Sequence, residues 1–371
     1  MAGLLTAPVR HRARFHELTV SRVERLTDQA VALSFAVPVD LAKEYAFEPG
    51  QHLTLRATID GAEVRRSYSI CLSRRQASRR RELRVASATV DGGAMSTWLN
   101  SAVAVGDRLQ VMTPLGGFTC PTSPSQARHH VFFAGGSGIT PTLSLLSTVL
   151  EEEPLSSVTL VYGNRRTDTV MFLEELQDLK DTFPTRLQLV HVLSREAQES
   201  ELLSGRLDRD RVSRLVATLA PVDAVDEWYA CGPQGMVEGV QAELAERGVE
   251  GHHVHHEVFH VVDQESPRPV PLPPPGAVPE ATVTVTLDGR RTVVEMPSRE
   301  ETILAATLRS RPDAPYSCTG GVCGTCRARV VEGQVRMDRN YALEPEELAA
   351  GIVLACQSHP VTDTVTLDYD A

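Results

Sequence analysis

The chain has 371 residues, 42% of them hydrophobic and 23% charged, a length that predicts two or three separate hydrophobic cores. This ordinary composition excludes a disordered, fibrous or disulfide-dense protein, and the net charge of −11 argues against a nucleic-acid-binding role, which needs a basic surface. No apolar run approaches the ~18 residues that span a membrane, and the N-terminal apolar stretch is too short for a secretory signal. We therefore expect a cytoplasmic protein with reduced thiols and no membrane partner. The sequence indicates no oligomeric state.

The first segment, residues 14–122, contains short β-forming runs separated by turn signals. The runs are LTVSRV, AVALSFAV, HLTLRATI, VRRSYSICL and LRVASATV, and PGQ, DGA, DGG and PLGG lie between or after them. This pattern predicts an antiparallel β-barrel. We expect the Arg-rich stretch from Arg74 to Arg84 to be an exposed loop, and a docking patch for an acidic partner remains the alternative.

The run Arg66-Ser67-Tyr68-Ser69 in this segment resembles the R-x-Y-S signature of ferredoxin-NADP reductase-like flavoproteins. Arg66 offers a planar charged group to the flavin pyrophosphate. Tyr68 offers an aromatic surface beside the isoalloxazine, and Ser69 a hydrogen bond near its redox-active nitrogen. An ordinary surface strand would read similarly, so this motif alone is only moderately specific.

A second flavin element of the same family matches the run GGAMSTWL at residues 92–99. Its glycine turn opens a short helix, whose amides and hydroxyls can bind phosphate. The resemblance makes Gly93, Met95, Ser96 and Thr97 candidate FAD-binding residues.

The second segment, residues 123–262, alternates strands with helices. HHVFFAGG precedes TLSLLSTVLEEE, VTLVYGN precedes MFLEELQDLK, RLQLVHVLS precedes another helical stretch, and EWYACGP precedes GMVEGVQAELAERG. This order predicts an α/β domain with a parallel sheet.

The run from Phe132 to Pro141, FFAGGSGITP, is a strand, a glycine turn and a helix start. Free amides there can hold a dinucleotide pyrophosphate at the end of a parallel strand. In the resembled family this segment binds the nicotinamide cofactor, which makes Gly136, Gly138, Thr140 and Pro141 candidates. The turn lacks the third glycine of the usual fingerprint, so its position after R-x-Y-S carries the assignment.

Arginines follow the next two strands of the α/β segment. Arg165 and Arg166 end one strand, and Ser194 and Arg195 end the next. Arginines at these positions can pair with a 2′-phosphate, so we expect NADPH as the cofactor. Solvated arginines are the alternative, and NADH remains an option.

The fourth strand ends in Cys231-Gly232-Pro233, where the family places a cysteine near the contact between nicotinamide and flavin. A small buried hydrophobe is the alternative for Cys231. Phe259, at the end of the domain, is expected to reach the flavin, and with Ser69 and Cys231 it completes the candidate catalytic set. The histidine-rich run HHVHHEVFH alternates as a strand does, so we expect a solvated sheet edge rather than a metal site.

Residues 263–280 hold seven prolines and predict an extended linker, with a proline-rich ligand for another domain as the alternative. Beyond it, residues 281–371 contain four of the seven cysteines. TVTVTLDG and RTVVEMP predict a hairpin. Ser298 and Glu301 form a capping-box pattern before a helix.

The cysteine spacing is Cys318-x4-Cys323-x2-Cys326, with Cys356 following at a distance. This is the plant-type [2Fe–2S] spacing, so the four thiols are candidate iron ligands. A tetrahedral zinc site is the alternative, although zinc sites usually use two close cysteine pairs. The segment resembles a ferredoxin, which implies an α+β β-grasp domain.

From Arg14 to the C-terminus the chain resembles the reductase subunits of phenylacetyl-CoA epoxidase complexes. FEPGQHLTL, RRSYSIC, AGGSGITP, YGNRR and above all NYALEPEELAAGIVLACQSHPVT carry the resemblance. It implies an NADPH-dependent flavin and iron–sulfur oxidoreductase that passes electrons to the di-iron oxygenase component of phenylacetate degradation. The alternatives are the reductase of a Rieske-type steroid hydroxylase or of a desaturase and, from another class, a cluster-based redox sensor.

Overall fold

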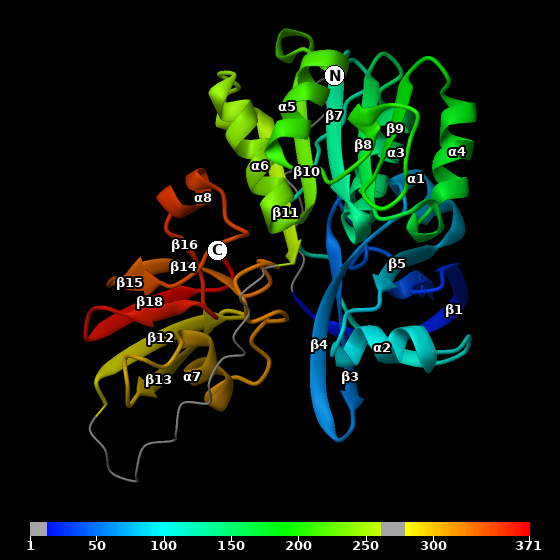
Figure 1. The fold of residues 1–371 in the computed structure, drawn as a ribbon. Coiled ribbons are helices and arrows are strands. Elements are labelled where there is room, and N and C mark those ends of the chain that lie inside the picture. The colour runs from blue at the N-terminus through cyan, green and yellow to red at the C-terminus, as the bar shows by residue number, and fades with distance from the viewer. Residues whose placement is uncertain (1–12, 261–278) are drawn as a thin grey trace, which may run out of the picture.

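The structure is a computed structural model that describes residues 13–260 and 279–371. Three lobes are visible in Figure 1: a parallel α/β lobe at the top, a curled β-sheet below it and a smaller α+β lobe beside both. This arrangement confirms the multidomain fold class. The sequence-based linker at 263–280 lies outside the described residues except for its last two positions. No helix in the described ranges is long and apolar enough to cross a membrane.

The curled sheet has six antiparallel strands in the order β4-β3-β6-β1-β2-β5. An isolated bridge between Ile70 and Val85 joins its two edges, so the sheet curls into a barrel. The strands are β1 (Phe15–Thr27), β2 (Ala30–Ala36), β3 (His52–Ile59), β4 (Ala62–Ser69), β5 (Glu82–Ala88) and β6 (Arg108–Met112). The sequence-based interpretation missed β6, because five residues are too few to show a clear alternation. Helix α2 (Ala94–Ser101) packs against β3, β4 and β5.

The α/β lobe has a five-stranded parallel sheet in the order β11-β10-β7-β8-β9. Helices α3 and α4 contribute to the core on one face, and α5 and α6 to the core on the other. The elements are β7 (His129–Gly135), α3 (Ile139–Glu152), β8 (Ser157–Asn164), α4 (Leu173–Thr182), β9 (Leu187–Leu193), α5 (Arg209–Leu219), β10 (Glu227–Pro233), α6 (Gln234–Glu246) and β11 (Val254–His260). Short 3-10 helices span Val39–Leu41, Gly136–Gly138, Thr167–Thr169, Glu201–Leu203, Val222–Ala224 and Gly251–His253. Parallel strands all end at one edge, so the glycine turn after β7 and the ends of β8, β9 and β10 lie together.

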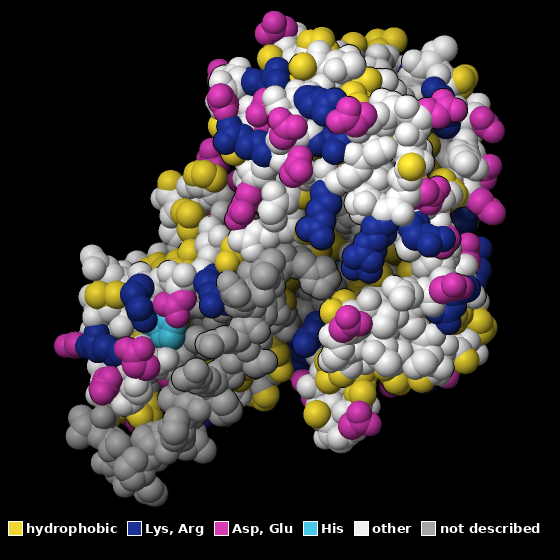
Figure 2. Space-filling model, in the orientation of Figure 1, with side chains coloured by type: hydrophobic (Ala, Val, Ile, Leu, Met, Phe, Trp, Pro, Cys, Tyr) yellow, Lys and Arg dark blue, Asp and Glu magenta, His cyan; other side chains and the backbone are white. Residues whose placement is uncertain are grey.

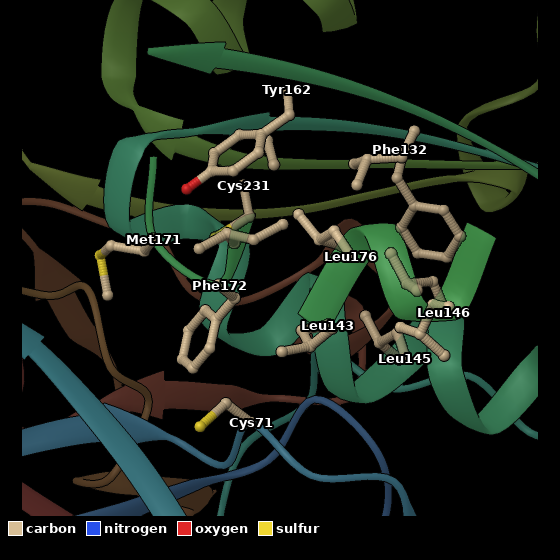
Figure 3. Packing of buried hydrophobic residues seen from close by; sticks show 14 of the residues in the cluster. Cys71, Phe132, Leu143, Leu145, Leu146, Tyr162, Met171, Phe172, Leu176 and Cys231 are labelled. Carbon is tan, nitrogen blue, oxygen red and sulfur yellow. The ribbon is translucent and has the colours of Figure 1, made fainter. Parts of the chain in front are cut away.

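The barrel and the α/β lobe share one continuous core, which includes Cys71 and Phe118 from the barrel side. Figure 3 shows Cys71 below Phe172 and Leu143, two residues of the α/β lobe in the same core. Because this core crosses the boundary, the two lobes position each other rigidly.

The Arg-rich stretch after Leu72 is a helix, α1 (Arg74–Arg80), and the expectation of a loop was wrong. Ser73 and Gln76 form a capping box at its start. Arg74 lies 2.9 Å from Glu48 and 2.5 Å from Glu152, and the next strand's Arg84 lies 2.8 Å from Glu175. Two arginines of this basic stretch therefore form ion pairs with acidic residues of the α/β lobe, and these pairs join the two lobes.

The third lobe has a five-stranded sheet in the order β13-β12-β18-β14-β16 and a two-stranded ribbon, β15-β17. Its elements are β12 (Ala281–Leu287), β13 (Arg290–Met296), α7 (Ile303–Ser310), β14 (Arg327–Glu332), β15 (Val335–Met337), α8 (Pro345–Ala349), β16 (Ile352–Leu354), β17 (Ser358–Pro360) and β18 (Thr364–Asp368). The predicted hairpin is β12-β13, and β12 buries every second side chain. The predicted capping box was wrong: Thr302, not Ser298, caps α7 by accepting a hydrogen bond from the Ala305 amide.

Candidate active site

One cavity of about 330 Å³ lies where the three lobes meet. Its walls come from β4, the end of β5, the start of α2, the glycine turn, β11 and the loop that carries the first cysteines. Ten of the candidate residues line it: Arg66, Tyr68, Ser69, Gly93, Met95, Ser96, Thr140, Phe259, Cys318 and Cys323. The fold thus brings the flavin motifs, the nicotinamide turn and two of the cysteines to one space.

Strand β4 presents three different groups to this cavity. Arg66 is exposed, and its guanidinium donates to the Arg65 carbonyl at 2.7 Å. Loss of hydration raises the pKa of Tyr68 to about 12, so its ring is a neutral aromatic surface. Ser69 is buried opposite His52 of β3. A cation, an aromatic face and a hydroxyl therefore lie in order along one strand beside the cavity.

The start of α2 forms another wall. Ser96 donates a hydrogen bond to the Gly93 carbonyl at 3.0 Å and accepts one from the Val90 amide at 3.1 Å, which closes the turn. Met95 is buried and lines the cavity. Thr97 is exposed and does not line it, so its flavin role stays a prediction.

The glycine turn approaches β10 closely. A Cβ on Gly138 would lie 2.1 Å from the Cys231 carbonyl oxygen, so only glycine fits there. Thr140 donates to the Ser137 carbonyl at 3.0 Å, and both residues line the cavity. Gly136 has a φ of +53°, and its carbonyl accepts a hydrogen bond from the Tyr162 hydroxyl at 3.0 Å. Pro141 is buried in the first turn of α3.

Cys231 lies one layer behind the cavity wall. Its side chain is fully buried, and burial raises the pKa of the thiol well above its usual value. The thiol lies 4.0 Å from Oε2 of Glu257, a residue of β11 that does line the cavity. Burial raises the pKa of Glu257 to about 8. The sequence-based interpretation assigned Glu257 no role, although a single acidic residue among histidines and apolar residues was a usable signal.

The candidate 2′-phosphate residues lie at the ends of β8 and β9, away from this cavity. The Ser194 amide donates to the Asn164 carbonyl at 2.9 Å, and the Arg195 amide to the Arg165 carbonyl at 2.8 Å, so the two strand ends are adjacent. Arg166 pairs with Asp168 at 3.0 Å. Arg165 and Arg195 are exposed, and neither side chain has a partner in the part of the chain that is described. Figure 2 shows Lys and Arg side chains along the lower edge of the α/β lobe, above the barrel.

Gly232 and Pro233 end β10 beside the glycine turn. Pro233 is exposed and caps α6, and neither residue lines the cavity. Their place at the edge where the nicotinamide turn lies is compatible with the nucleotide role that the family resemblance implies.

The four clustered cysteines gather as two pairs of thiols. Cys318 neighbours Cys323, whose amide donates a hydrogen bond to the Cys318 sulfur at 3.4 Å, and Cys326 neighbours Cys356 in one buried cluster. The neighbouring Cys323 side chain and the backbone amides of the loop lower the pKa of Cys318 to about 6. Among the described residues, no three metal-ligating side chains gather around a position for a single ion. Two thiol pairs fit the two irons of a [2Fe–2S] cluster and do not fit one tetrahedral zinc.

Most of the histidine-rich run forms β11, the edge strand of its sheet, as expected, and His252 and His253 end the preceding 3-10 helix. Two histidines of β11 are less solvated than expected, because they have acidic partners. His255 lies 2.9 Å from Glu227, and His256 lies 3.4 Å from Glu344 of the third lobe.

Three family models match consecutive parts of the chain. They are an oxidoreductase FAD-binding domain over residues 17–120, an oxidoreductase NAD-binding domain over 132–242 and a 2Fe-2S iron-sulfur cluster binding domain over 285–361. The chain is 42% identical to a subunit of the 1,2-phenylacetyl-CoA epoxidase of Escherichia coli K12, with 96% of this chain and 98% of that protein covered. The chain belongs to the family that contains this epoxidase subunit and related oxygenase reductase components.

Another member of this reductase family and a solved structure also match nearly the whole length of the chain. The ferredoxin reductase component of 3-ketosteroid-9-alpha-monooxygenase from Rhodococcus rhodochrous is 36% identical over 99% of this chain and 100% of its own length. The solved structure of phthalate dioxygenase reductase, 21% identical, shares the fold with a TM-score of 0.57 over 95% of this chain and 98% of that one. The chain is an NAD(P)H-dependent oxidoreductase with FAD-binding and [2Fe–2S] domains.

Proposed function

We propose that this chain is the reductase component of a phenylacetyl-CoA epoxidase, which passes electrons from NADPH through FAD and a [2Fe–2S] cluster to a di-iron oxygenase component. The observation that carries the proposal is the single cavity lined by both the R-x-Y-S strand and two cluster cysteines. The 42% identity to the epoxidase subunit supports this oxygenase as the acceptor. The expected division is 14–122 for FAD, 123–262 for the nucleotide, 263–280 as linker and 281–371 for the cluster, in a cytoplasmic protein.

When bound, FAD accepts a hydride as two electrons and releases them singly, which suits a one-electron cluster. In this proposal Arg66 neutralises the pyrophosphate, Tyr68 packs beside the ring and Ser69 offers a hydroxyl to it. Gly93, Met95, Ser96 and Thr97 supply the second flavin element. Cys318, Cys323, Cys326 and Cys356 hold the two irons.

The nucleotide is proposed to enter over the glycine turn. Gly136, Gly138, Thr140 and Pro141 form its floor, and Gly232 and Pro233 the adjacent wall. In this proposal nicotinamide meets flavin beside Glu257 and Phe259, with Cys231 behind Glu257. Glu257, neutral below about pH 8, keeps a negative charge away from the hydride path.

NADPH is proposed over NADH because Arg165 and Arg195 stand side by side without acidic partners in the described structure. Arg166 and Ser194 belong to the same strand ends. Replacing Arg165 and Arg195 by Ala should raise KM for NADPH about tenfold or more and leave KM for NADH unchanged, because only the 2′-phosphate loses its partners. Arg214→Ala, an exposed arginine on α5, is the matched control. Equal effects on the two nucleotides would contradict the assignment.

The acceptor is tested by anaerobic stopped-flow spectroscopy of the FAD- and cluster-loaded protein. NADPH should bleach the flavin first and the cluster second. Adding the epoxidase oxygenase component with phenylacetyl-CoA and oxygen should reoxidise the cluster and form epoxide. The oxygenase component of 3-ketosteroid-9-alpha-monooxygenase is the comparison, since its reductase is 36% identical. Turnover with that component but not with the epoxidase would refute the partner, and flavin bleaching without cluster reduction would refute the internal chain.

A further inference from the structure

A direct hydrogen-bonded contact joins the barrel to the cysteine loop. His52, at the start of β3, lies with its ring Nε2 3.2 Å from the Thr325 hydroxyl. The two residues are 273 positions apart in the chain, and their side chains are only 2% and 3% exposed. A buried polar contact between lobes is costly unless both partners are satisfied, so it specifies one arrangement of the loop on the barrel.

The contact continues to one of the candidate iron ligands. The Thr325 hydroxyl lies 3.2 Å from the sulfur of Cys323. A cysteine on iron is a thiolate and has no proton to donate. The hydroxyl must then donate to sulfur, and its oxygen is free to accept a hydrogen bond from elsewhere. The neighbour placed to donate is His52 Nε2.

The imidazole performs this task as the tautomer that carries its proton on Nε2. Burial lowers the pKa of His52 to about 4, so at neutral pH the ring carries one N–H only. His52 also lines the cavity that contains Tyr68 and Ser69. It therefore stands between the proposed flavin site and the proposed cluster.

We infer that His52 is a positioning residue for the cluster: its Nε2–H donates to Thr325 Oγ1 and orients that hydroxyl toward the sulfur of Cys323. The inference rests on the proposed function, because it assigns a barrel residue to the tuning of the cluster. Hydrogen bonds to a ligating sulfur stabilise the reduced cluster, which carries more negative charge, and raise its potential. The barrel thus makes the cluster a better electron acceptor when the loop is seated on it.

A second contact seats the same loop. The guanidinium of Arg65 on β4 lies 4.0 Å from the ring centre of Tyr316, and Glu63 pairs with Arg65 at 2.9 Å. Tyr316 and Thr325 flank the first two cysteines, so the loop is held on both sides. This contact is independent of His52 and should keep the loop near the barrel in His52 variants.

The test measures the cluster's midpoint potential by an EPR-monitored redox titration of the full-length, FAD-loaded protein. Thr325→Val and His52→Leu should each lower the potential, by about tenfold in the reduction equilibrium for one hydrogen bond, or about 59 mV for a one-electron couple. The double variant should show no further shift, because both changes break one chain. Thr325→Ser and His52→Gln keep the donors and should restore the potential. Thr366→Val, on β18 of the same lobe, is the matched control and should leave it unchanged.

Two results would overturn the inference. One is a wild-type potential in His52→Leu while Thr325→Val is shifted, and the other is additive shifts in the double variant. Nitrogen-15 NMR of the histidine rings gives a readout that needs no turnover and should show the Nε2–H form of His52; the Nδ1–H form would overturn the inference. If His52→Leu does not fold, Thr325→Val and Thr325→Ser still test the link together with the NMR. If NADPH fails to reduce flavin or cluster while these potentials behave as expected, the proposed function fails and the His52 link stands.

Discussion

At the scale of single residues, the site depends on groups that the surrounding structure holds in unusual states. Glu257 is an acidic residue in the wall of the cavity, and its carboxyl group lies 4.0 Å from the buried thiol of Cys231. At Gly138 the backbone of the glycine turn packs directly against the backbone of Cys231 in β10. Both effects come from neighbours that are distant in sequence, and both lead to measurable consequences.

Glu257→Gln should change how stability depends on pH. The folded-state pKa of Glu257 is about 8 against an ordinary value of 4.5. Below pH 4.5 the Glu257 carboxyl is neutral in both the folded and the unfolded protein, so it does not lower the free energy of unfolding. Between pH 4.5 and 8 it ionises in the unfolded chain but not in the folded protein, so the free energy of unfolding of the wild type falls as the pH rises. The Gln variant should therefore gain stability over wild type at pH 9 relative to pH 4. Urea unfolding at the two pH values measures this.

Glu199→Gln is the control for that experiment, because Glu199 is exposed. It should show the wild-type difference between the two pH values. A Glu257→Gln variant that also does so would contradict the raised pKa.

Gly138→Ala should destabilise the α/β lobe by about 1–3 kcal/mol, because the new methyl group would meet the Cys231 carbonyl oxygen at 2.1 Å and force the turn to move. Gly235→Ala is the matched control: nothing lies within 4 Å of its Cβ position in helix α6, and about 0.4–1 kcal/mol of stabilisation is expected there. Thermal unfolding compares the two variants. Equal behaviour would mean that the turn adapts freely.

At the scale of elements, ion pairs join helices of the α/β lobe to strands of the barrel. Arg84 on β5 is 5% exposed, and the Glu175 carboxylate of α4 lies 2.8 Å away. Because Arg84 is buried, removing its partner should lower the free energy of unfolding more than breaking a surface salt bridge would.

Glu175→Ala should cost about 3 kcal/mol of unfolding free energy, since it leaves the buried Arg84 cation without its partner. Glu174→Ala alters the preceding, exposed position on the same helix and should change stability by less than about 0.5 kcal/mol. Denaturant unfolding followed by circular dichroism measures both. A cost for Glu175→Ala as small as that of the control would show that Arg84 is solvated.

At the scale of the whole molecule, the cysteine-containing lobe touches both others. His52 and Arg65 of the barrel contact its loop. On the α/β side, His256 lies 3.4 Å from Glu344, and Tyr341 packs against the core that includes α5 and α6. These contacts place two cysteines on the wall of the cavity that β4 also lines.

Tyr341→Ala removes the apolar contact between the cysteine-containing lobe and the α/β core. The equilibrium between docked and undocked positions of that lobe should therefore shift about tenfold toward the undocked position. Small-angle X-ray scattering should show a larger radius of gyration. Leu348→Ala on α8, 41% exposed, is the control and should scatter as wild type does. An unchanged radius in Tyr341→Ala would mean that the remaining contacts suffice.

The sequence by itself determined the features that local patterns encode. Cysteine spacing indicated the cluster, R-x-Y-S and the glycine turn indicated flavin and nucleotide sites, and alternating patterns separated barrel, α/β and ferredoxin segments. These features were readable because ligand loops and strand–turn–helix units are contiguous in the chain. Only the tertiary structure decided which residues meet: the pairing of the thiols, the burial of Glu257, the ion pairs of helix α1 and the His52–Thr325 contact. These contacts join residues that are 26, 78 and 273 positions apart in the chain, so no local pattern records them.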